Sequence, residues 1–163
     1  IPTIALAHGF CIGGATSLVS ACDIRLATKD AKFSIGETKL GLVADVGVIQ
    51  RMPKIVSSGD MNELALTGRI FDGEHAERIR FVSKAYDNSD ELFEAGEKLA
   101  NEISSNSKRI VQATKQALEK SSNLTIDQGL EYAKLWSTSF LVSEDLREGV
   151  MAFLEKRDPK FNE

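Results

Sequence analysis

Short apolar runs separated by glycine-rich turns dominate the first third of the chain. Residues 2–7 form a mostly apolar run typical of a buried strand, and residues 23–28 alternate polar and apolar side chains as a half-buried strand does. Residues 31–35 have the composition of a third strand. Between the first two strands, the glycine-rich stretch 9–15 predicts a turn, and the small residues of 16–22 predict a short helix.

After Pro53 the spacing of apolar residues becomes helical. Before it, a loop over 36–42 leads to Asp45, which stands where a helix limited by Pro53 would begin. A helix that stops at Gly68 follows. The other expected elements are a short helix at 72–79, a strand at 82–86, and helices at 89–105, 107–121, 125–142 and 143–157 with N-caps at Ser89, Ser107, Thr125 and Ser143.

The order of these elements predicts an α/β fold in two parts. Residues 1–88 hold all the strands, and residues 89–163 form a helical region. The chain length of 163 residues falls within the range of about 100–200 residues usual for one domain. The chain opens at Ile1 directly on a buried strand, without an initiator methionine. We therefore expect further sequence upstream, so that 1–88 is the later part of a larger domain.

Composition narrows the possible functions. The net charge of −4, with no basic patch, disfavours nucleic acid as a partner. No apolar run approaches the ~18 residues that would span a bilayer. Cys11 and Cys22 lack the spacing of metal ligands, so we expect no metal site. The ending "FNE" is not a peroxisomal tripeptide, which favours a mitochondrial or cytoplasmic location without excluding the peroxisome.

Two neighbouring glycines, Gly13 and Gly14, are the first candidate for chemistry. They stand between a strand and the start of a helix, where free backbone N–H groups point outward and the helix dipole is positive. Such a helix start can bind an anion, or a carbonyl oxygen that gains negative charge. The simpler alternative is a tight turn, the commonest use of glycine.

Two acids on successive loops are the second candidate. Glu37 and Asp45 are eight residues apart, and at one edge of a sheet they could face a common pocket and share proton transfer. The alternatives are a solvated side chain for Glu37 and a helix N-cap for Asp45. Ser17 lacks a readable histidine partner, so a hydroxyl on a helix face is a better interpretation than a nucleophile.

Read together, these segments resemble a known family. The turn "HGFCIGG", the strand "ACDIR", the segment "AKFSIGETKLGL" and the element "QRMP" occur in the order and spacing of the enoyl-CoA hydratase/isomerase (crotonase) family. "ALTGRIFDGEHAERIRFVSK" and "REGVMAFLEKRDPKF" extend the likeness over nearly the whole chain. "RIRFVSK" departs from the family, which usually has a glycine before the apolar pair. The resemblance implies a crotonase-like spiral of ββα turns over 1–88 and a helical oligomerisation region over 89–163, in a homotrimer or homohexamer.

The resemblance also implies an enzyme that acts on acyl-CoA thioesters and needs no cofactor, because CoA is part of the substrate. Family members bind the thioester oxygen as an enolate with two backbone N–H groups, one of which matches Gly14, beside Gly13. The "FLEKR" ending is similar to family members whose C-terminal residues lie near the CoA of an adjacent subunit. This likeness makes Lys156 a candidate CoA contact.

The positions of the acidic residues indicate which group within the family this chain resembles. Hydratases of the family use two glutamates, one matching Glu37 and the other falling at Ser17, whose hydroxyl cannot activate water as a carboxylate does. "GLVADVG" instead resembles the Δ3,5-Δ2,4-dienoyl-CoA isomerases, in which carboxylates matching Glu37 and Asp45 move protons along a conjugated chain. That group typically has an aspartate where this chain has Ser17, so we expect Ser17 to contact substrate without transferring a proton.

The activity implied is therefore isomerisation of 3,5-dienoyl-CoA to 2,4-dienoyl-CoA in fatty-acid β-oxidation. One alternative is an enoyl-CoA hydratase or a Δ3-Δ2 enoyl-CoA isomerase with Glu37 as the main acid/base. Another is a non-catalytic CoA-binding or assembly subunit.

Overall fold

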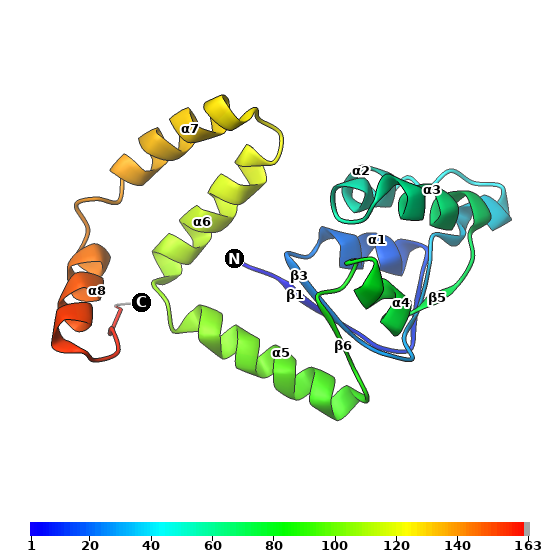
Figure 1. Ribbon diagram of the computed structural model, residues 1–163, viewed down its shortest axis with the longest axis horizontal. Helices are drawn as coiled ribbons and strands as arrows, with labels where there is room; N and C mark the ends of the chain where they lie inside the picture. The colour runs from blue at the N-terminus through cyan, green and yellow to red at the C-terminus, as the bar shows by residue number, and fades with distance from the viewer. Residues whose placement is uncertain (162–163) are drawn as a thin grey trace. The chain divides into compact units, whose positions relative to one another are not determined.

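A computed structural model describes residues 1–161 of the chain. They form two compact units. The first unit is Thr3–Lys98, and the second is Leu99–Glu163 together with Ile1–Pro2. Figure 1 shows that the strands lie in the part coloured blue to green and that the long helices follow it. The final "FNE" lies partly outside the described residues.

Two three-stranded sheets form the framework of the first unit. In the first sheet, β1 (Ile4–Ala7), β3 (Ile24–Thr28) and β6 (Lys84–Tyr86) lie parallel in that order. In the second sheet, β2 (Phe10–Ile12) pairs in parallel with β4 (Lys32–Ser34), which pairs in antiparallel fashion with β5 (Phe71–Asp72). The α/β fold class and the strands near 2–7, 23–28, 31–35 and 82–86 are thereby confirmed.

The prediction of a continuous turn over 9–15 was wrong. The turns fall at Gly9 and Gly13, which both have positive φ. The three residues between them form β2, in which Cys11 stands opposite Phe33 of β4. A three-residue strand is too short to show the alternation that identifies strands in a sequence.

Helices connect the strands of the first unit. They are α1 (Gly14–Ala21), a 3₁₀ helix (Gly36–Leu40), α2 (Val48–Arg51), a 3₁₀ helix (Met52–Lys54), α3 (Ser58–Thr67) and α4 (Gly73–Arg78). The short α2 passes directly into the second 3₁₀ helix, which contains Pro53. As expected, α3 stops at Gly68, which adopts the left-handed conformation common at helix C-termini.

The hydrophobic core of the first unit is built around three aromatic rings. Phe33 stacks on Phe71 at a centroid distance of 5.5 Å and meets Phe81 edge-on, also at 5.5 Å. Val48 and Met52 are fully buried in the same cluster. This packing fixes β4 and the start of α2, the two elements that flank the segment containing Glu37 and Asp45.

The second unit is helical, and α5 (Ser89–Ser104) runs into it from the first. It contains α6 (Lys108–Ser121), α7 (Ile126–Thr138) and α8 (Glu144–Glu155). The side chains of Ser107, Thr125 and Ser143 accept hydrogen bonds from backbone N–H groups and cap these three helices as predicted. The cap expected at Ser89 was wrong, because Asn88 Oδ1 accepts the Glu91 N–H at 2.9 Å instead.

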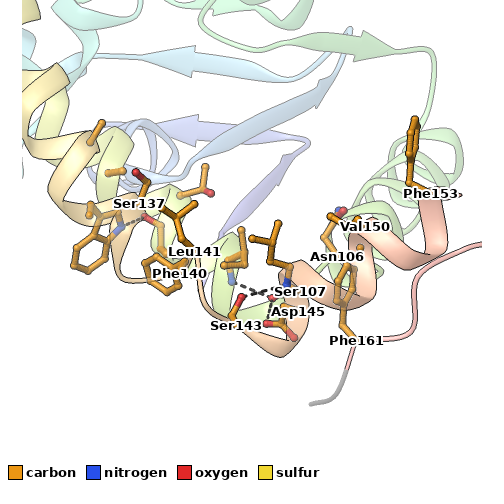
Figure 2. Close-up of a pocket in the computed structure, with 18 of the residues that line it drawn as sticks. Asn106, Ser107, Ser137, Phe140, Leu141, Ser143, Asp145, Val150, Phe153 and Phe161 are labelled. Carbon is orange, nitrogen blue, oxygen red and sulfur yellow. Dashed lines mark hydrogen bonds between the residues drawn. The ribbon is translucent and has the colours of Figure 1, made fainter.

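A cavity of about 720 Å³ lies within the second unit, among α6, α7 and α8. Figure 2 shows its aromatic and aliphatic wall, which includes Phe140, Leu141 and Phe153. The carboxylate at its edge, Asp145, accepts a hydrogen bond from Ser107 Oγ at 2.6 Å. An acid already paired in this way offers no obvious proton-transfer chemistry. Among the described residues, no helix is long and apolar enough to cross a membrane.

Candidate active site

The start of α1 is fixed by the strands below it. The Gly13 N–H donates to Ser34 O of β4 at 2.8 Å, and the buried Thr16 hydroxyl lies 2.5 Å from Cys11 O of β2. Gly13 adopts φ 57, a conformation that favours glycine. Gly14 is the first residue of the helix and has no preceding helical carbonyl to bind. Its N–H donates to no other described residue, which leaves it available to a ligand oxygen.

Glu37 lies beside this helix start. A Cβ atom built on Gly13 would lie 3.3 Å from Glu37 Oε1, so the carboxylate lies close to the glycine turn. The other oxygen, Oε2, is buried and has no hydrogen-bond partner among the described residues. Buried polar atoms are nearly always hydrogen-bonded in native proteins. An unpartnered carboxylate oxygen therefore suggests that a ligand or water is its partner.

Gly14 and Glu37 line one cavity of about 550 Å³, a size usual for small-molecule sites. The wall also includes apolar side chains, so a bound carbonyl would be partly shielded from water. Gly68, expected only as a helix stop, lines the cavity as well, and its carbonyl oxygen accepts from Ser34 Oγ at 3.0 Å. The full lining is Ile12, Gly13, Gly14, Ser34, Gly36, Glu37, Lys39, Leu40, Gly68 and Ile70.

Asp45 does not cap a helix. Gly47 holds the N-cap position of α2, with φ 98 and no side-chain hydrogen bond, so the capping alternative for Asp45 is wrong. Asp45 is exposed and makes no hydrogen bond or ion pair with another described residue. It is also not among the residues that line the Glu37 cavity. Its neighbours Val43 and Val46 are exposed apolar side chains, 81% and 61% accessible, so the carboxylate lies on an apolar loop.

The other predicted site residues, Ser17 and Lys156, do not line the Glu37 cavity. Ser17 is only 1% exposed, and its Oγ has no partner among residues 1–161, although the residue does not line the cavity. Ser17 follows Gly13 by one helical turn, and its N–H donates to Gly13 O at 3.1 Å. Lys156 belongs to the second unit, where it adopts φ 55 and ends α8 as an exposed C-cap.

The residues of the site are suited to acid–base chemistry. Burial raises the pKa of the Cys11 thiol, which keeps this cysteine protonated and a poor nucleophile. Within residues 1–161, no three His, Cys, Asp or Glu side chains are grouped to hold a metal ion. The Glu37 carboxylate and the Gly14 N–H, which donates to no other described residue, line the same cavity, and the Asp45 carboxylate lies on the following loop.

Comparison with known proteins shows the family of this chain. The family model described as enoyl-CoA hydratase/isomerase matches residues 1–163. The chain therefore belongs to the enoyl-CoA hydratase/isomerase, or crotonase, family.

Two relatives narrow the likeness within the family. The mitochondrial Δ3,5-Δ2,4-dienoyl-CoA isomerase of Dictyostelium discoideum is 51% identical over 160 residues, which cover 98% of this chain and 55% of that protein. The peroxisomal Δ3,5-Δ2,4-dienoyl-CoA isomerase of Arabidopsis thaliana is 43% identical and is covered to 58%. The chain thus spans about half the length of the curated relatives it matches.

Solved structures share the fold. An enoyl-CoA hydratase from Mycobacterium marinum superposes with a TM-score of 0.92 at 32% identity, over 98% of this chain and 63% of that one. A probable enoyl-CoA hydratase/isomerase from Mycobacterium abscessus gives 0.91 at 36% identity, over 98% and 63%. The crotonase fold expected from the sequence is therefore confirmed.

Proposed function

We propose that the protein is a Δ3,5-Δ2,4-dienoyl-CoA isomerase of fatty-acid β-oxidation. The observation that carries this proposal is the single cavity that brings together the unpartnered Glu37 carboxylate and the free Gly14 N–H. The relatives with 51% and 43% identity are both named Δ3,5-Δ2,4-dienoyl-CoA isomerases, which supports a 3,5-dienoyl-CoA as the substrate. Asp45, which does not cap α2, supplies the second carboxylate that the reaction needs.

The reaction moves two conjugated double bonds by one carbon toward the thioester. One carboxylate of the Glu37–Asp45 pair removes a proton from C2, and the electrons delocalise along the chain into the thioester oxygen. The Gly14 N–H donates a hydrogen bond to that oxygen, and a donor of this kind stabilises the transition state by roughly 3–4 kcal/mol. The other member of the pair, which enters as the carboxylic acid, delivers its proton to C6 and leaves as the carboxylate. Atoms and charge balance without a metal or a redox cofactor.

A second activity is favoured by one observation. Asp45 is not among the residues that line the Glu37 cavity. Glu37 alone could then serve as the acid/base of Δ3-Δ2 isomerisation or of hydration. A CoA-binding or assembly subunit without activity is the remaining alternative.

The proposal extends to partners and compartment. We propose that the helices of 89–163 assemble a homotrimer or homohexamer and that Lys156 lies near the CoA of an adjacent subunit. We propose a mitochondrial location, because the Dictyostelium relative is named mitochondrial. The Arabidopsis relative is named peroxisomal, which makes the peroxisome the alternative.

The test is an activity assay of the full-length protein with a 3,5-dienoyl-CoA. The 2,4-isomer has a longer conjugated system with the thioester, so its ultraviolet absorbance rises as the reaction proceeds. Glu37→Gln should lower kcat by about 10²–10⁴-fold, the usual contribution of a general acid/base. The matched control Glu74→Gln, in α4 outside the cavity, should keep the rate. Hydration of a 2-enoyl-CoA without isomerisation would favour the second activity, and CoA binding with neither reaction would favour the third.

A further inference from the structure

The Asp45 loop is held by one arginine side chain. Arg51, at the end of α2, turns back so that its Nη1 donates to the backbone carbonyl of Val46 at 3.1 Å. A Cβ atom built on Gly47 would lie only 2.0 Å from this Nη1 and 2.9 Å from Cζ. The guanidinium therefore occupies the space that any side chain at position 47 would need, and Gly47 with φ 98 also has a conformation that other residues rarely adopt.

Little else fixes the backbone beside Asp45. Ala44 and Val48 are buried in the core and anchor the two ends of this short stretch. Between them, two hydrogen bonds hold the backbone: the bond from Arg51 Nη1 to Val46 O, and the first helical bond, from the Arg51 N–H to Gly47 O at 3.1 Å. The Asp45 side chain itself has no hydrogen bond or ion pair with the described residues. The place of its carboxylate therefore depends on the backbone of this stretch, which Ala44 anchors on one side and the bond from Arg51 holds on the other.

We infer that Arg51 is a positioning residue that sets the place of the Asp45 carboxylate through the Val46 carbonyl. This inference rests on the proposed function, because it needs Asp45 to transfer a proton. Arginine suits the task since its planar guanidinium can donate to a carbonyl while lying flat against a glycine. Lysine has a single ammonium on a flexible stem and could reach the carbonyl without filling the same plane.

A purely structural role for Arg51 predicts a different outcome. The Arg51 side chain is exposed and binds a carbonyl only five residues away in sequence. Loss of such a surface bond should shift Tm by no more than roughly 2–4 °C. Misplacement of a reacting group by about 1 Å, in contrast, can lower a rate by about 10²-fold. Rate and stability therefore separate the two roles.

The experiment is a double-mutant cycle in the full-length enzyme with a 3,5-dienoyl-CoA substrate. Arg51→Ala should lower kcat by about 10–100-fold, with little change in KM, because the carboxylate is displaced while the cavity of Glu37 and Gly14 is untouched. Arg51→Lys should recover part of that loss. In an Asp45→Asn background, Arg51→Ala should cause no further loss of kcat, since it acts through the missing carboxylate. Arg78→Ala, an exposed arginine of α4, is the control and should match the wild type.

Two results would overturn the inference. One is an Arg51→Ala enzyme with the full rate. The other is the same fold loss of kcat in the wild-type and Asp45→Asn backgrounds, which would mean that Arg51 acts independently of Asp45. If Arg51→Ala folds poorly, Arg51→Met gives a second test, because it keeps the length of the side chain but cannot donate to Val46 O, and it should reproduce the loss of kcat. A full-rate Asp45→Asn enzyme would instead contradict the proposed two-carboxylate reaction, and the inference would fall with it.

Discussion

Two acids of the first unit, Glu37 and Asp45, differ in their partners from two acids of the second, Asp145 and Glu148. In the first unit, Glu37 Oε2 is buried without a partner, and Asp45 makes no hydrogen bond or ion pair with the described residues. In the second unit, Asp145 accepts from Ser107 Oγ, and Glu148 receives two hydrogen bonds from the Arg157 guanidinium, at 2.6 and 3.0 Å. Glu37 Oε2 and the Asp45 carboxylate thus have no partner among the described residues, whereas Asp145 and Glu148 each accept hydrogen bonds from another part of the chain.

If the proposed function is correct, this difference separates two acids that transfer protons from two acids that stabilise structure. A buried polar atom without a partner costs stability. Folding alone would not select such an arrangement, and exceptions of this kind gather at functional sites. The paired acids show the usual solution, in which each carboxylate is satisfied within the protein. Neutralising Glu37 or Asp45 should therefore change activity, and neutralising Asp145 or Glu148 should change stability.

The largest effect should come from Asp45. Asp45→Ala in the full-length protein removes the proposed proton-transferring group and should lower kcat by about 10²–10⁴-fold. Tm should stay near that of the wild type, because Gly47 and not Asp45 occupies the N-cap of α2. Loss of a true cap would cost roughly 0.5–2 kcal/mol of unfolding free energy. Steady-state kinetics and a thermal melt measure the two quantities.

Asp30→Asn is a suitable control for this experiment, since Asp30 is an exposed acid of the same unit. It should leave both kcat and Tm unchanged. A destabilised Asp45→Ala protein with normal turnover would reverse the assignment. It would place Asp45 with the structural acids and leave Glu37 as the acid/base of the first unit.

An intermediate effect concerns the two kinds of apolar surface. Phe33 is fully buried in the core of the first unit, whereas Phe153 of the second unit is 83% exposed. Phe33→Ala should lower the free energy of unfolding by about 3–5 kcal/mol, because it leaves a cavity among packed aromatic rings. Phe153→Ala should cost less than about 0.5 kcal/mol in the unfolding of a monomer, as exposed positions usually do. Denaturant unfolding of both variants makes the comparison.

An equal loss of unfolding free energy in the two variants would contradict the exposure of Phe153. It would mean that Phe153 is covered in the whole protein by something outside its own unit. Sedimentation of the Phe153→Ala variant would then show whether a second copy supplies the cover, as the proposed oligomer requires.

Local rules predicted most elements of the fold. The alternation in 23–28 identified β3, and the serine and threonine caps marked the starts of α6, α7 and α8. Such signals depend only on neighbouring residues, so they can be read from a sequence. β2 was missed because its three residues are defined by pairing with β4, a contact made across the fold. The cap at Ser89 was wrong because Asn88, one residue earlier, competes for the same N–H group.

The candidate site was predictable only in part. Glycines before a helix and an acid after a strand indicated Gly14 and Glu37, and the structure brings them to one cavity. Arg51 carried no comparable signal, because its role depends on the guanidinium lying where Gly47 has no side chain. The sequence spacing of Gly47 and Arg51 is that of one helical turn. It becomes informative only when the glycine is known to have φ 98.

The smallest effect is expected for the paired acid Glu148. Hydrogen bonds lower the pKa of Glu148 from 4.5 to about 2. The largest effect comes from the Arg157 guanidinium, and the next from the Lys160 N–H. A carboxyl whose pKa is lower in the folded state stabilises the fold above its unfolded pKa and loses that contribution as pH falls through the folded value. The contribution should therefore be complete above about pH 4.5 and vanish near pH 2. It should be small, because the pair lies at the surface, where water and salt screen it.

Thermal melts of the wild type and Glu148→Gln across this pH range measure the contribution. The wild type should melt at the higher temperature near neutral pH, and the two curves should converge as the pH approaches 2. Added salt should narrow the gap, since it screens exposed charges. The kcat of Glu148→Gln should stay near the wild-type value, because Glu148 is not part of the Glu37 cavity. A Tm difference that persists unchanged at pH 2 would show that Glu148 stabilises the fold by packing and not by its charge.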